Sequence, residues 1–138
     1  MIKTDRILLS IAGSFSFGIG AYHFVLPHQW HWSKYTNQLP GMIEWGLYAI
    51  NSYLSFFFVL LGIFTWRTIY LIKKRNSREI TVLLISAIFW AYNFFYQVFV
   101  PVPIPQRLWF IQWAFLGSAF LTTVFYSIPL WRLRRHEV

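Results

Sequence analysis

Polar side chains that could carry chemistry recur inside the apolar segments of this 138-residue chain. They comprise one histidine, one glutamate and four amides: His23, Glu44, Asn51, Asn93, Gln97 and Gln112. Counted from the ends of the apolar segments, all six fall in the same half of a membrane. A polar group that faces lipid costs several kcal/mol, so six at one level indicate a shared cavity or a shared helix interface.

His23 and Glu44 are the candidate catalytic residues. They lie within one or two helical turns of the same interface, on segments joined by one loop. A histidine hydrogen-bonded to a buried carboxylate can move a proton or orient a ligand carbonyl, which would suit an enzyme acting on a lipid-soluble substrate. In the alternative interpretation both side chains lie at headgroup level, and Glu44 merely occupies the first turn of its helix.

Amides and aromatic residues on two helical faces form the candidate ligand-binding set. Offsets of three and four place Glu44, Tyr48, Asn51 and Ser55 on one face, and Trp90, Asn93 and Gln97 on another. The candidate set is Tyr48, Asn51, Trp90, Asn93, Gln97 and Gln112. Amides bind carbonyl and hydroxyl oxygens without a charge penalty, as a quinone or a lipid headgroup would require. Alternatively, the amides bond one another between helices, typically for about 1 kcal/mol or less per bond.

Histidine spacing raises the question of a metal. His28 and His31 would share a face if helical, and Glu44 could join them, but no second metal motif reinforces this pattern. We therefore predict no metal site, and His28 and His31 are the candidate ligands if one exists. Haem needs an axial pair on facing membrane helices, and only His23 qualifies. The chain has no cysteine, so we expect no iron–sulfur cluster, and a quinone remains as the compatible cofactor.

Four long apolar segments must position these side chains. With 57% hydrophobic and 12% charged residues, the chain lacks the polar cover of a water-soluble globule. Each segment holds about 20 residues, enough to cross the ~30 Å hydrocarbon core. We predict an all-α fold in which residues 1–138 form a single membrane domain, a bundle of four transmembrane helices at about 7–26, 43–66, 80–100 and 109–130.

The first segment is rich in small residues, which let helix backbones approach closely in lipid. Ser16 and Gly20 form a small-xxx-small pair, and Ser14, Gly18 and Ala21 recur at helical spacing. We expect the helix to end at Pro27, and residues 27–42 to lie on the bilayer surface as a short amphipathic segment. Residues 101–105 alternate with proline, which predicts an extended strap. The half of the bundle nearer the termini is expected to be dry and apolar.

Charge predicts the orientation. Ten of the 12 lysines and arginines lie at the two termini or in the connection after the second segment. Because cations concentrate on the cytoplasmic side, both termini should be cytoplasmic. The net charge of +8 then reflects this asymmetry and attraction to anionic lipids, and a nucleic-acid partner is not expected because no soluble basic face exists. We expect the protein to reside in the bacterial plasma membrane.

The first 60 residues resemble a known pattern. Residues 17–24 read Phe-Gly-Ile-Gly-Ala-Tyr-His-Phe, and Pro27, Trp30 and the Leu39-Pro40 pair follow. This resembles the DoxX-like membrane proteins, in which a Gly-x-x-His-Phe helix end precedes a proline, an aromatic residue and a Leu-Pro. The family's Gly-x-x-Glu at the second helix is replaced here by Glu44-Trp45-Gly46. The resemblance implies a four-helix bundle and, for some members, association with quinone-linked respiratory or oxidative-stress complexes.

Three functions remain open from the sequence. The first is an accessory membrane subunit whose outer polar cavity binds a small amphipathic ligand such as a quinone or a lipid. The second is a membrane enzyme that uses His23 and Glu44 as acid and base. The third is a structural subunit that docks into a larger membrane complex through its aromatic loop and its proline-rich strap. The expected partners are membrane lipids and either further copies of this chain or a larger membrane complex.

Overall fold

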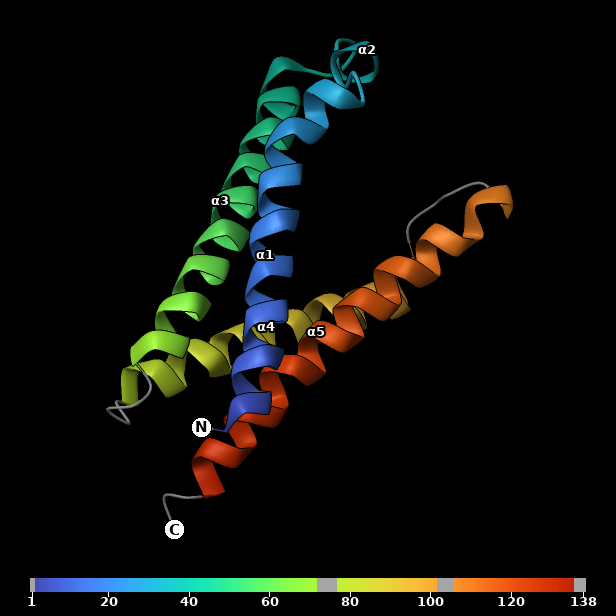
Figure 1. Cartoon of the computed structure of the whole chain (residues 1–138). Coiled ribbons are helices and arrows are strands. Elements are labelled where there is room, and N and C mark those ends of the chain that lie inside the picture. The colour runs from blue at the N-terminus through green and yellow to red at the C-terminus, as the bar shows by residue number, and fades with distance from the viewer. Residues whose placement is uncertain (1, 72–76, 102–105, 136–138) are drawn as a thin grey trace. The chain divides into compact units, whose positions relative to one another are not determined.

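The computed structural model describes residues 2–71, 77–101 and 106–135. In these ranges the chain forms helices and turns without a strand, which confirms the all-α prediction (Figure 1). The elements in chain order are α1 (Lys3–Gln29), α2 (Ser33–Thr36), α3 (Gly41–Leu71), α4 (Ser77–Phe99), η2 (Gln106–Leu108) and α5 (Trp109–Arg135). The proline-rich residues 102–105 and the basic residues 73–75 lie outside the described ranges.

Four of these helices are long and apolar enough to cross a membrane, namely α1, α3, α4 and the stretch from η2 through α5. The shortest, α4, has 23 residues and so extends about 35 Å, more than the ~30 Å hydrocarbon core. The predicted segments agree with these helices, although α1, α3 and α5 extend several residues beyond their predicted ends. The protein is therefore an integral membrane protein by the length and composition of its helices.

The chain divides into two compact units. The hairpin unit is Gly13–Phe64, and the terminal unit combines Met1–Ala12 with Thr65–Val138. The helices α1 and α3 each begin in one unit and end in the other, so the boundary crosses two continuous helices rather than a linker.

In the hairpin unit, glycines bring the backbones of α1 and α3 into contact. A Cβ atom built on Gly20 would lie 2.7 Å from the Ser55 carbonyl oxygen, and one built on Gly62 would lie 2.7 Å from the Gly13 carbonyl oxygen. A side chain larger than hydrogen does not fit at either position. The two helix backbones therefore approach more closely than they could with any residue other than glycine at these positions. Of the two predicted small-residue faces, the Ser16–Gly20 pair is the buried one. The other residues, Ser14, Gly18 and Ala21, are exposed.

The prediction that α1 ends at Pro27 is wrong, since the helix continues to Gln29. A proline inside a helix lacks the N–H that would bond the carbonyl four residues earlier, here that of His23. Asn51 on α3 supplies the missing donor, since its Nδ2 donates to the His23 carbonyl oxygen over 2.8 Å. The helix can therefore pass through the proline without leaving a carbonyl unsatisfied in lipid.

The terminal unit is built around α4 and α5, which pack along each other (Figure 1). Leu83, Ala87 and Trp90 of α4 are buried, as are Ala119 and Tyr126 of α5. These positions recur at helical spacing, so one stripe of each helix forms the apolar core of the unit.

Polar contacts also join elements of the terminal unit that are distant in sequence. Asp5, only 2% exposed, accepts a 2.8 Å hydrogen bond from Arg132 Nη1 and pairs the start of α1 with the end of α5. Thr68 donates to Glu79 over 2.8 Å, and both side chains are buried. Within the predicted segments, Thr65 and Tyr126 are fully buried and their hydroxyl groups lie 2.8 Å apart, so the interior near the termini is not purely apolar, contrary to the expectation. The buried groups are tolerated because each has a partner.

Candidate ligand pocket of the hairpin unit

His23 and Asn51 hold α1 and α3 together through two reciprocal hydrogen bonds. Asn51 Nδ2 donates to the His23 backbone oxygen, and the Asn51 Oδ1 lies 3.2 Å from His23 Nδ1. An amide oxygen only accepts, so His23 Nδ1 must carry the proton and donate. Ser55, fully buried, donates in turn to the Asn51 backbone oxygen over 2.6 Å. We call the His23–Asn51 pair the amide clamp.

Glu44 is hydrogen-bonded to Thr36, whereas the sequence suggested His23 as its partner. Its Oε1 accepts a 2.7 Å hydrogen bond from Thr36 Oγ1, at the end of the short helix α2. Thr36 is 6% exposed, so this bond is shielded and ties the loop to the first turn of α3. His23 pairs with Asn51 instead. The two candidate catalytic residues are thus each engaged in positioning the hairpin.

Aromatic contacts and one unusual backbone angle shape the loop between α1 and α3. Trp30 Nε1 donates to the Tyr22 hydroxyl over 3.1 Å, and the Trp32 and Tyr48 rings lie 5.8 Å apart. His31 has φ of 52°, in the left-handed region that costs a non-glycine residue free energy. Its Nδ1 is 3.1 Å from the Gln29 carbonyl oxygen, a contact that stabilises the turn. The loop contains the short helix α2, and the position of this loop at the bilayer surface stays a prediction.

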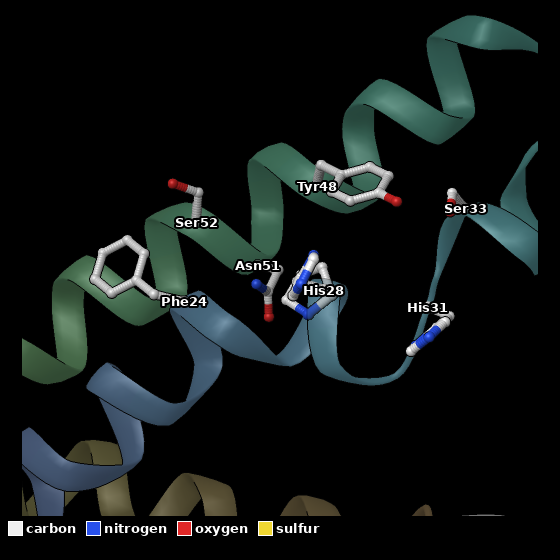
Figure 2. A pocket seen from close by; sticks show the side chains of 8 residues that line it. Phe24, His28, His31, Ser33, Tyr48, Asn51 and Ser52 are labelled. Atoms are coloured by element: carbon white, nitrogen blue, oxygen red, sulfur yellow. The ribbon is translucent and has the colours of Figure 1, made fainter.

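An open pocket of about 580 Å³ lies between the ends of α1 and α3 and the loop (Figure 2). This volume falls in the range of small-molecule sites. Phe24 and Pro27 supply an apolar wall, and the other lining residues are polar or amphipathic: His28, His31, Ser33, Tyr48, Asn51 and Ser52. Figure 2 shows these side chains coming from both helices and from the loop. No acidic residue is among them.

Tyr48 and Asn51 are the two residues of the predicted binding set that line this pocket, and the metal candidates His28 and His31 line it too. Ser52 and Ser33 were not predicted. Ser52 lies four residues after Tyr48, so its position on the pocket face follows from helical spacing. No sequence pattern predicts that Ser33 lines the pocket. Its position there depends on the turn at His31, which helical spacing does not predict.

The remaining predicted residues belong to the terminal unit. Trp90 is 3% exposed and packs in the core. Asn93, Gln97 and Gln112 are half-buried, and Gln97 Nε2 donates to Asn93 Oδ1 over 2.6 Å, one turn away on the same helix. The Gln97 Oε1 is buried without a partner among the described residues. A single cavity shared by both predicted faces stays a prediction.

No group of three histidine, cysteine or acidic side chains that could hold a metal ion occurs in residues 2–71, 77–101 and 106–135.

Comparison with known proteins yields no relative. No protein-family profile matches the chain, and no curated protein or solved structure is significantly similar to it.

Proposed function

We propose that this protein binds a small amphipathic molecule in the pocket of the hairpin unit, and that it acts as an accessory subunit in the bacterial plasma membrane. The observation that carries the proposal is the pocket's lining, which combines apolar Phe24 and Pro27 with several polar groups. A ligand with an apolar tail and a compact polar headgroup would satisfy both kinds of lining group.

The position of the pocket along the helices supports the same class of ligand. It lies at the end of the hairpin near the loop, where a membrane-spanning helix meets the headgroup layer. Exposed Trp30 and Tyr35 in this loop are the residue types that concentrate at that layer. With both termini cytoplasmic, as the positive charges favour, the pocket would open to the outer leaflet. A quinone or a lipid-like molecule can enter there from the bilayer.

The amide clamp gives the pocket a defined shape. Asn51 is 8% exposed and uses both ends of its amide on His23, so it positions the pocket wall instead of adapting to a ligand. Glu44 is held by Thr36 on the loop side. These contacts favour binding over acid–base chemistry, because His23 and Glu44 are each occupied by a different partner.

The experiment purifies the protein in mild detergent and identifies bound small molecules by native mass spectrometry and lipid extraction. The variant Ser52→Trp should fill the pocket and remove the bound molecule, since Ser52 is exposed on its lining. Ile50→Trp is the matched control, because Ile50 is 66% exposed on the same helix and does not line the pocket. Equal occupancy in wild type and Ser52→Trp, or no bound amphiphile in the wild type, would contradict the proposal.

A further inference from the structure

The hydrogen bonds of the loop determine which nitrogen of His31 remains available to a ligand. His31 Nδ1 lies 3.1 Å from the Gln29 backbone oxygen. A carbonyl oxygen only accepts, so Nδ1 carries a proton and donates. In the neutral imidazole the second nitrogen, Nε2, then has no proton and is an acceptor. This bond therefore favours the tautomer in which Nε2 is the acceptor.

The pocket's other imidazole, that of His28, has no hydrogen bond within the described residues that fixes its tautomer, so either of its ring nitrogens can be the donor. Both ends of the Asn51 amide are used in the amide clamp. The hydroxyl groups of Ser33, Ser52 and Tyr48 can donate as well as accept, so they adapt to either kind of ligand. Among these lining residues, His31 is the one whose hydrogen bond within the loop leaves a single free ring nitrogen, Nε2, as an acceptor.

We propose that the ligand's headgroup carries a hydroxyl group, of the phenol, quinol or alcohol class, and that this hydroxyl donates to Nε2 of His31. This inference rests on the proposed function, because it assigns the headgroup of the molecule that the pocket binds. A ligand with only carbonyl or ether oxygens would present an acceptor to an acceptor. Such a ligand would lose the hydrogen bond while Nε2 is still withdrawn from water.

Two probes that differ in one donor test the assignment. The phenol probe is para-hexylphenol, and para-hexylanisole has the same tail with a methyl ether in place of the hydroxyl. Titration calorimetry on the full chain in detergent micelles measures the two dissociation constants, and the Ser52→Trp variant measures partitioning into the micelle. We expect the wild type to bind the phenol about five- to tenfold more tightly than the ether, which is the affinity that one added hydrogen bond provides.

The variant His31→Phe keeps a ring of similar size and lacks the acceptor, so this preference should fall to about one. His31→Gly is the second variant, because glycine adopts a positive φ freely and would preserve the turn if the phenylalanine variant does not fold. Ile50→Trp is the control, because Ile50 is 66% exposed on α3 and does not line the pocket, so this variant should keep the preference.

The outcomes separate the two proposals. If neither probe binds the wild type more than it binds Ser52→Trp, the proposed function fails, and this inference with it. If both probes bind equally well, the proposed function stands and the hydroxyl assignment is overturned. A preference that persists in both His31 variants, or that disappears in Ile50→Trp, likewise overturns the assignment to His31.

Discussion

Asn51 of the hairpin unit and Asn93 of the terminal unit are the same residue type inside apolar helices, yet their contacts differ. Asn51 bonds His23, which lies 28 residues away on another helix, through both ends of its amide. Asn93 accepts from Gln97, four residues further along the same helix. The first pair joins two helices, whereas the second pairs two polar side chains of the same helix.

The difference follows from what surrounds each asparagine. Asn51 faces a helix with a proline, and Pro27 leaves the His23 carbonyl without its normal donor. Gly20 and Gly62 also bring the two backbones close enough for a short amide to reach across. On α4 the described contacts of Asn93 are local, and the Gln97 Oε1 has no partner in the residues that the structure describes. The contribution of an amide to the stability of a membrane helix pair therefore depends on whether an unsatisfied polar group of the other helix lies within its reach.

The largest expected effect comes from closing the glycine contact. In Gly62→Ala the new Cβ would lie 2.7 Å from the Gly13 carbonyl oxygen, so α1 and α3 must move apart. We expect the free energy of unfolding to fall by about 3 kcal/mol, as for severe overpacking. Reversible unfolding in mixed SDS micelles, followed by tryptophan fluorescence, measures it.

The matched control is Gly46→Ala on the same helix, where a Cβ meets nothing within 4 Å. This variant should be neutral, or stabilising by up to about 1 kcal/mol through helix propensity. Similar losses in both variants would show that α1 and α3 do not touch at Gly62.

The next effect concerns the amide clamp. Asn51→Ala leaves the His23 carbonyl and Nδ1 without partners, and we expect a loss of about 2 kcal/mol in the free energy of unfolding. In a Pro27→Ala background the new N–H of residue 27 can bond the His23 carbonyl within the helix. The cost of Asn51→Ala should then fall by about 1 kcal/mol.

A double-mutant cycle over Pro27 and Asn51, by the same unfolding assay, measures this coupling. An interaction energy of zero would contradict the explanation of how α1 passes through its proline.

The smallest effect should come from the terminal unit. Asn93→Ala removes one acceptor from Gln97, which is only half-buried. We expect a loss of about 0.5 kcal/mol, the typical value for a hydrogen bond between side chains in a membrane protein. If Asn93→Ala proves as costly as Asn51→Ala in the unfolding assay, then Asn93 also joins separate elements, and the contrast between the two asparagines is wrong.

Several features follow from the sequence alone. The four helices and their approximate ends follow from apolar segments of about 20 residues, because lipid leaves the backbone no alternative to internal hydrogen bonding. The Ser16–Gly20 pair at the contact with α3 follows from the need for small residues where helices touch. The predicted face of Tyr48 and Asn51 follows from helical spacing, and both residues line the pocket.

Only the tertiary structure decided which partner each polar residue has. Glu44 was a plausible partner for His23, but the turn at His31 brings Thr36 to Glu44 and the glycine contacts bring Asn51 to His23. Asp5 pairs with Arg132 across 127 residues, and no local pattern announces such a contact. Spacing along a helix gives the direction of a side chain. The partner depends on which helices pack together and at what distance, and so does the pocket that Pro27, His31 and Ser52 line.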